Sequence, residues 1–201
     1  MKAFQLLLIC LVFIACSSEN KSYIDTIQKE RYEKNLQFSN PQESILPKTD
    51  IANFKGLDYF QIDEKYKIVA QFERTEGMPI FEMQTTTDRK PLYTTYGKAH
   101  FTLNGQEHTL HIYQNQKLMT TVEYADYLFI PFNDLTNGKT SYGGGRYLDL
   151  SIPEEGATTI ILDFNRVYNP YCAYNSKYSC PIPPQENNLK IAIEAGVKKY
   201  H

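Results

Sequence analysis

The 201-residue sequence has no tryptophan and no block of basic side chains. Its 21 lysines and arginines against 23 aspartates and glutamates give a formal net charge of -2, and this balance does not favour nucleic acid as a partner. Tyrosine (16 residues) and phenylalanine (11 residues) supply the aromatic content. These residue types are more typical of sheet faces and partly wet surfaces than of a helical bundle.

Several catalytic and binding signatures are also missing. The sequence has no glycine-rich phosphate loop, no G-x-S-x-G, no H-E-x-x-H and no C-x-x-C. Their absence argues against the enzyme classes that use these motifs, but it does not exclude another catalytic mechanism. His100 and His111 fall on the polar face of a predicted hairpin, and two imidazoles without a third ligand make a poor metal site. We therefore predict no metal site and no cofactor.

The N-terminus has the pattern of an export signal. Lys2 precedes an apolar run from Ala3 to Ala15 that is too short to span a bilayer comfortably. Phe13-Ile14-Ala15-Cys16 resembles a lipobox, although phenylalanine stands where leucine is usual. We expect residues 1–15 to be a lipoprotein signal peptide, residues 16–21 a lipidated cysteine and tether, and residues 22–201 one β-rich domain. The alternatives are an ordinary signal peptide with a chance cysteine and an uncleaved anchor.

Lipid on Cys16 would anchor the protein stably to a membrane. The residues after Cys16 contain neither the aspartate of inner-membrane retention nor the lysine-acidic run of surface export. The sequence therefore predicts a location at the periplasmic face of the outer membrane.

Export determines how the four cysteines are interpreted. Cys10 would leave with the signal and Cys16 would carry lipid, so Cys172 and Cys180 remain. A pair of cysteines in an oxidising compartment favours a disulfide. Their separation does not fit a zinc pair, and no adjacent base would activate a thiol.

The pattern of apolar residues predicts many short strands and few helices. One helix is expected from Ser22 to about Phe38, with Ile24, Ile27, Tyr32 and Leu36 as its apolar stripe. Strands are expected at residues 66–73, 79–85, 98–113 (two strands), 127–132, 146–152, 159–164 and 189–194. The fold class is mainly β (α+β): an antiparallel sandwich or partly open barrel with an N-terminal helix.

Asn104-Gly105 lies between two alternating runs and is the preferred pair for a two-residue hairpin turn. This turn predicts Leu103 opposite Gln106 and Phe101 opposite His108. Phe101 and Leu103 would then share the core face with Leu110 and Ile112.

Three long motifs carry a family resemblance. They are G-R-Y-L-D at Gly145–Asp149, D-F-N-x-x-Y-N-P-x-C-A-Y at Asp163–Tyr174, and C-P-x-P-P-x-x-N-x-L at Cys180–Leu189. The chain resembles the bacterial and archaeal domain of unknown function 1684 family. The family usually ends Ala-Gly-Glu-Lys, whereas this chain has Ala195-Gly196-Val197-Lys198. The resemblance implies a shared fold and a shared polar patch. It does not indicate an activity, because none is established for the family.

The short turn between residues 151 and 158 suggests a hairpin of the two flanking strands, which would place Arg146 opposite Asp163. Leu148 and Ile161 would share their face, and Asp149 would point to the other side with Tyr147 and Leu162. The polar patch predicted around this pair consists of Tyr142, Arg146, Asp149, Asp163, Asn165, Asn169 and Tyr174.

Two interpretations of this patch remain open. In the first, its polar groups brace the long segment 165–188 through hydrogen bonds. In the second, they line a pocket roofed by Tyr142, Tyr168 and Tyr174, in which Arg146 meets a small anionic or sugar-like ligand. The corresponding functions are a non-catalytic binding or envelope-maintenance lipoprotein and, as the alternative, a hydrolase that uses Asp163 or Asp149 as its general base. The sequence does not indicate which protein partner, if any, the domain has.

Overall fold

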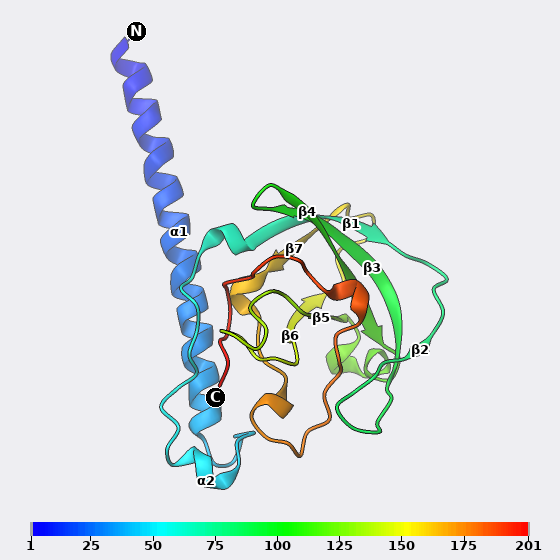
Figure 1. Cartoon of the computed structure of the whole chain (residues 1–201). Helices are drawn as coiled ribbons and strands as arrows, with labels where there is room; N and C mark the ends of the chain where they lie inside the picture. The colour runs from blue at the N-terminus through cyan, green and yellow to red at the C-terminus, as the bar shows by residue number, and fades with distance from the viewer. Residues whose placement is uncertain (1, 201) are drawn as a thin grey trace.

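In the computed structural model of the chain, the backbone is described for residues 2–200 and the side chains for residues 21–200. The side chain of Cys16 lies outside these residues. Figure 1 shows one strongly curled antiparallel sheet with a long helix, α1 (Lys2–Ser39), along one side. The predicted fold class is confirmed, and of its two forms the sheet adopts the partly open barrel.

The sheet has seven strands in the order β6-β5-β4-β3-β1-β7, with β2 paired to β3 outside this path. The strands are β1 (Lys67–Arg74), β2 (Phe81–Glu82), β3 (Leu92–Leu103), β4 (Gln106–Asn115), β5 (Tyr127–Phe132), β6 (Arg146–Ser151) and β7 (Thr159–Asp163). Every strand pair is antiparallel. The expected strand at residues 79–85 is reduced to the two residues of β2 and a bridge between Thr85 and Pro181.

The hairpin β3–β4 forms as its turn predicts. Asn104 and Gly105 have φ of 51° and 75°, the left-handed conformation that a tight hairpin turn requires. Leu103 pairs with Gln106 and Phe101 with His108. Phe101, Leu103, Leu110 and Ile112 are all buried in the barrel core.

The predicted hairpin of β6 with β7 is wrong. Strand β6 pairs with β5, and β7 pairs with β1, so the short connection joins the two edges of one curled sheet. The sheet partner of Arg146 is Phe132, and that of Asp163 is Lys67. Ile161 is 51% exposed and Leu162 is buried, the reverse of the predicted faces.

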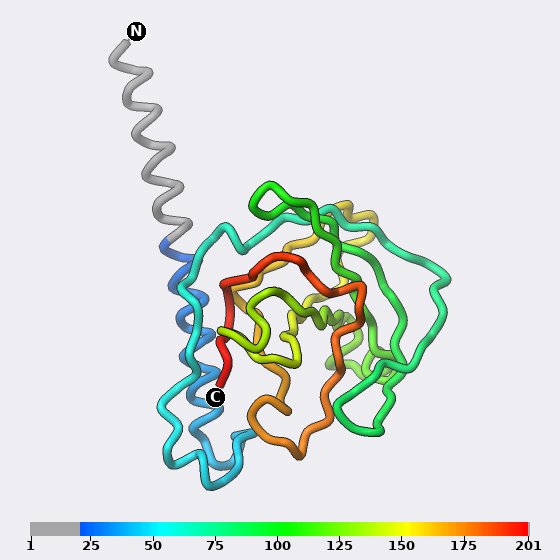
Figure 2. Tube along the Cα trace, in the orientation of Figure 1, coloured from blue at the N-terminus to red at the C-terminus, as the bar shows by residue number. Residues whose placement is uncertain are grey.

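The C-terminal segment 189–197 fills the barrel without forming a strand, a second departure from the prediction. Leu189, Ile191 and Ile193 are buried, as their alternation suggests, and belong to the main core. Backbone hydrogen bonds tie its start to residues 133–135 and its end to Phe60 and Val167, all of them outside the strands of the sheet. In Figure 2 this segment, in red, passes across the concave side of the curled sheet.

The helices are mostly short apart from α1. They are α2 (Lys48–Ile51) and the single-turn helices η1 (Glu64–Tyr66), η2 (Leu118–Thr120), η3 (Val122–Tyr124), η4 (Phe164–Arg166), η5 (Tyr171–Ala173) and η6 (Gln185–Asn187).

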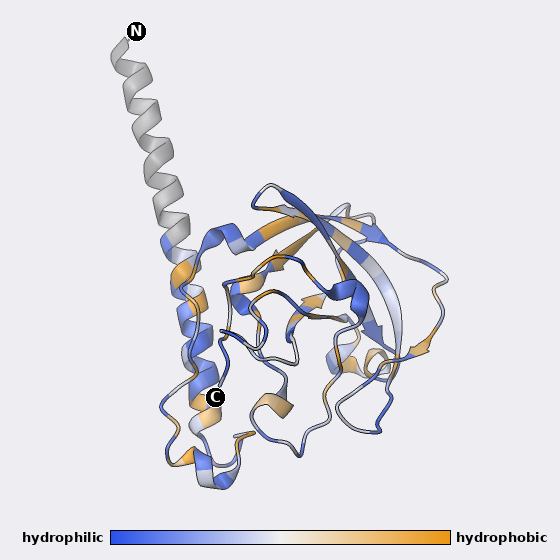
Figure 3. Cartoon of the chain, viewed as in Figure 1, coloured by the Kyte–Doolittle hydropathy of each residue, from blue (hydrophilic) through white to orange (hydrophobic). Residues whose placement is uncertain are grey.

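Helix α1 packs on the barrel through a narrow apolar stripe. Ile27 and Phe38 are buried, whereas Tyr32 and Leu36, predicted to face the core, are 63% and 52% exposed. Figure 3 shows mostly hydrophilic residues along the coloured part of the helix. The contact face is therefore more polar than the sequence indicates, and it includes Tyr23 and Arg31.

Candidate functional site

A cavity of about 1050 Å³ extends from α1 to the outer face of β5 and β6. Tyr127 and Phe129 on β5 and Tyr147 and Asp149 on β6 line it. They alternate along the strands with Leu128, Ile130 and Leu148, which face the barrel core. The segment 165–181 forms another wall of the cavity.

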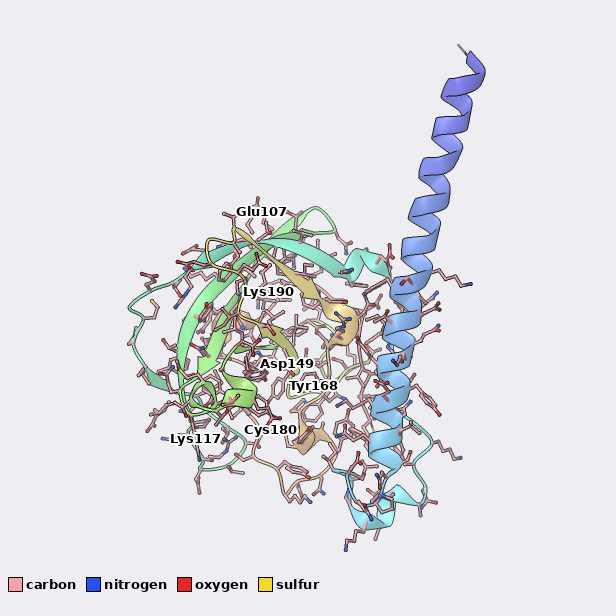
Figure 4. The ribbon with its side chains drawn as sticks, turned by 180° about the vertical axis from the view of Figure 1, so that it is seen from behind. Glu107, Lys117, Asp149, Tyr168, Cys180 and Lys190 are labelled. Atoms are coloured by element: carbon pink, nitrogen blue, oxygen red, sulfur yellow. The ribbon has the colours of Figure 1, made fainter. Side chains whose placement is uncertain are left out.

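Asp149 is the acidic side chain around which the cavity is organised. Its Oδ1 accepts hydrogen bonds of 2.7 Å from the hydroxyls of both Tyr127 and Tyr168. Among the described residues, no group donates a hydrogen bond to Oδ2. Figure 4 shows Asp149 and Tyr168 next to each other between the sheet and α1.

The carboxyl of Asp149 is open to solvent and yet enclosed by protein on most sides, because it lies within the cavity. This enclosure raises the pKa of Asp149 above its ordinary value of 3.8, while the hydrogen bonds from Tyr168 and Tyr127 and the charge of Lys34 oppose the rise. A carboxyl with a raised pKa in a cleft is a common property of functional sites.

Aromatic rings form most of the cavity wall around this carboxyl. Phe129 and Tyr147 meet edge to face with centroids 4.7 Å apart, and Tyr147 and Tyr168 do so at 5.8 Å. Burial raises the pKa of Tyr127, Tyr147 and Tyr168, so their hydroxyls remain protonated donors at neutral pH. The cavity is thus aromatic, with one acidic group held in a fixed orientation.

Arg146 does not face this cavity. Its side chain is fully buried, and its guanidinium binds Asp134 at 2.7 Å and donates to the backbone oxygens of Ile193, Ala195 and Val197. Arg146 therefore anchors the C-terminal segment inside the barrel. The predicted partner, Asp163, is wrong: Arg146 pairs with Asp134, and the segment that it holds is 193–197 and not the predicted 165–188.

Asp163 and Asn165 fix the helix to the barrel. Asp163 Oδ1 accepts from the Tyr23 hydroxyl at 2.8 Å and from the Asn165 backbone N–H at 3.1 Å. Asn165 also bonds both backbone groups of Asp63. Asp163 is 4% exposed, so it is a structural residue and poorly placed to act as a general base.

The remaining members of the predicted patch are separated. Asn169 donates to the backbone oxygen of Lys198 at 2.9 Å. Tyr174 lines the cavity near α1 and packs edge to face on Phe38 at 4.9 Å. Tyr142 lies instead beside Cys172. Tyr168 and Tyr174 line the cavity at Asp149, whereas Tyr142 and Arg146 do not.

Cys172 and Cys180 are neighbours and are present as free thiols. The backbone N–H of Cys172 lies 3.1 Å from Sγ of Cys180. The hydrogen bond from Cys180 lowers the pKa of Cys172 to about 7, and the same interaction raises the pKa of Cys180.

Within residues 21–200, no three acidic, histidine or cysteine side chains come together as a metal site. His100 binds Thr109 and Glu73 on the outer sheet surface. None of the helices in the described part of the chain is apolar over a length that would cross a membrane.

Sequence reasoning missed Tyr127 and Phe129 as site residues. The signal was present, because β5 is apolar at consecutive positions and not at alternate ones, a pattern that indicates burial on both faces of a strand. Tyr93 and Lys34 come from distant segments, and no local pattern connects them with Asp149.

The fold and cavity define an antiparallel, partly open barrel with an aromatic site beside an N-terminal helix. The chain belongs to the family described as Protein of unknown function (DUF1684), whose model matches residues 52–198. Its fold is similar to the solution NMR structure of an uncharacterized protein from Haloarcula marismortui, with a TM-score of 0.68 and 33% sequence identity. That match covers 90% of this chain and 96% of the archaeal chain. No curated protein matches the chain.

Proposed function

We propose that this protein is a non-catalytic binding protein that holds a small organic ligand in the cavity at Asp149. The observation that carries the proposal is the orientation of the carboxylate: two tyrosine hydroxyls fix Oδ1, and Oδ2 is left without a described donor in an open aromatic cavity. Ligand sites are typically concave, mostly apolar and supplied with few polar groups, and 1050 Å³ suits a small molecule.

The alternative, a hydrolase, has less support from the geometry. Asp163 is buried in structural hydrogen bonds, which leaves Asp149 as the candidate base. Where the family pattern has glutamate, this chain has Val197, which lines the cavity and is 1% exposed. Two-carboxylate hydrolysis would need a second acidic group near Asp149, and this valine does not provide one.

The cellular location is part of the same proposal and rests on the sequence. A signal peptide at residues 1–15 and lipid on Cys16 would hold the domain at the periplasmic face of the outer membrane. In that oxidising compartment Cys172 and Cys180, whose groups already lie in contact, would form a disulfide. The disulfide would staple the segment that walls the cavity.

A thermal-shift screen of the full-length protein against a metabolite library tests the proposal. A ligand at about 100 times its Kd stabilises the native state by about 2.7 kcal/mol. We expect stabilising compounds of one chemical class, and we expect Asp149→Asn to abolish their effect. Glu155→Gln is the matched control, because Glu155 is exposed and does not line the cavity. The proposal would be contradicted if no compound in the library stabilised the protein. It would also be contradicted if the stabilising compounds acted equally on Asp149→Asn.

A further inference from the structure

The carboxylate of Asp149 has no basic partner among residues 21–200, although several cations line the same cavity. Arg166 binds Glu30 through two hydrogen bonds of 2.9 and 2.8 Å. Arg89 donates to Ser179. Among the side chains that the structure describes, Lys34 is the cation whose charge acts on Asp149, and it donates a hydrogen bond to Gln37 at 3.1 Å. Asp149 therefore has no ion-pair partner among residues 21–200, although the charge of Lys34 acts on it.

Four of the tyrosines that line the cavity lie close enough to this charge to be affected by it. Burial raises the pKa of Tyr93, Tyr127, Tyr168 and Tyr171, and the negative charge of Asp149 raises each of them further. They come from β3, β5, the residues after η4, and η5, so they approach Asp149 from different sides. The faces of aromatic rings carry partial negative charge, and all four rings line the cavity.

We infer that the cavity takes an organic cation, an alkylated or quaternary ammonium compound, with its charged group between the carboxylate of Asp149 and the tyrosine rings. This inference rests on the proposed binding function and names the ligand class. A cation desolvated among aromatic rings is attracted by their quadrupoles, and Oδ2 of Asp149 supplies the opposite full charge.

The other ligand classes fit the site less well. An anion would approach the carboxylate of Asp149, and Arg146, which could have met it, is fully buried. Three arginines do line the cavity, but they are already bonded to other groups: Arg31 to the Phe60 oxygen, Arg89 to Ser179 and Arg166 to Glu30. A metal ion would find a single carboxylate, because no cluster of metal-ligating side chains exists among the described residues. A neutral sugar could stack on the rings but would leave the charge of Asp149 without a counterion.

Calorimetric titration of the full-length protein with choline tests the inference. The comparison ligand is 3,3-dimethyl-1-butanol, which has the same shape without the charge. At pH 8 we expect choline to bind at least tenfold more tightly than this neutral alcohol. Asp149→Asn should weaken choline binding at least tenfold and leave the affinity for the alcohol unchanged, while Glu155→Gln should change neither.

A second variant tests the inference independently, so that the test still stands if Asp149→Asn does not fold. Tyr171 is 42% exposed and makes no hydrogen bond to Asp149, so Tyr171→Leu should fold and weaken choline binding severalfold more than it weakens alcohol binding. Equal affinities for choline and the alcohol would overturn the inference and leave a site that selects by shape. Absence of choline binding would also overturn it; if the metabolite screen in addition finds no ligand, the proposed function fails with it.

Discussion

Tyr147 and Tyr168 exchange two backbone hydrogen bonds, of 2.9 and 3.1 Å. Tyr147 lies on β6 at one edge of the sheet, and Tyr168 follows β7 at the other edge. The pair thus links the two edges of the partly open barrel. It also brings the Tyr168 hydroxyl to Asp149, two residues beyond Tyr147, at 2.7 Å. The contact that links the edges of the fold therefore also builds the candidate site.

The buried pair of Arg146 and Asp134 should dominate the stability of the C-terminal segment. Removing either partner leaves the other charge buried and unpaired, and such changes typically cost about 3–5 kcal/mol. We expect this loss for both Arg146→Ala and Asp134→Ala, measured by denaturant unfolding. The double variant should lose clearly less than the sum of the two.

Asp163→Ala provides the comparison for this pair. Asp163 shares no hydrogen-bond partner with Arg146, so its loss combined with Arg146→Ala should be additive to within about 0.5 kcal/mol. Additivity between Arg146 and Asp134, or strong coupling between Arg146 and Asp163, would show that the pairing described here is wrong.

Local sequence signals predicted the elements of the fold better than their pairing. Asn104-Gly105 specifies both a turn and a register, and that hairpin is correct. The connection between β6 and β7 is also short, but a curled sheet brings its two edges together, so a short connection need not join paired strands. Leu189, Ile191 and Ile193 alternate as in a strand, although their burial comes from filling the barrel interior.

The candidate site was predictable in part. The motif that contains Arg146 and Asp149 drew attention to both residues, and parity along β6 correctly placed Tyr147 and Asp149 on one face. Which of the two residues, Arg146 or Asp149, faces the cavity depends on which of them is buried in the core. That burial depends on the packing of the whole barrel. The cavity itself needs α1, β5 and segment 165–181 together, and no local pattern relates these parts of the chain.

Asp149→Asn should stabilise the protein at neutral and higher pH. Because enclosure raises the pKa of Asp149 above its ordinary 3.8, the native state binds this proton more tightly than the unfolded chain does. Ionisation therefore destabilises the fold, and the stability present at low pH is lost as the pH rises through the raised pKa. We expect a higher Tm for Asp149→Asn than for wild type at pH 8.

The same measurement at lower pH supplies the control. As the pH falls through the raised pKa, wild-type Asp149 becomes neutral and the difference in Tm should shrink. Glu155→Gln, at an exposed position, should show no such trend. An Asp149→Asn variant that is less stable than wild type throughout this range would assign Asp149 a structural role instead.

The proposed disulfide between Cys172 and Cys180 can be tested in the protein isolated from membranes without reductant. Alkylation under denaturing conditions should find neither thiol free. Closing a loop of about nine residues is worth roughly 2.6 kcal/mol in the chain-entropy model, so reduction should lower the free energy of unfolding by about that amount. If both thiols are alkylated in the unreduced protein, the predicted disulfide is wrong.

Lipidation of Cys16 is predicted from the apolar run and from Ala15 before the cysteine. Mass spectrometry of the N-terminus from native membranes should find acyl chains on Cys16 and no residues before it. Replacing Cys16 with serine should prevent this processing. A mature chain that begins with an unmodified residue, or that retains residues 1–15, would refute lipid anchoring.

The most direct test of a cation site at Asp149 is the ¹³Cγ resonance of its carboxyl, followed by NMR through a pH titration and identified by its loss in Asp149→Asn. Without ligand, the pKa of Asp149 should lie above 3.8. Saturating choline should lower this pKa, because the bound cation favours the charged carboxylate. A carboxyl that titrates at or below 3.8, and whose pKa choline leaves unchanged, would contradict the site.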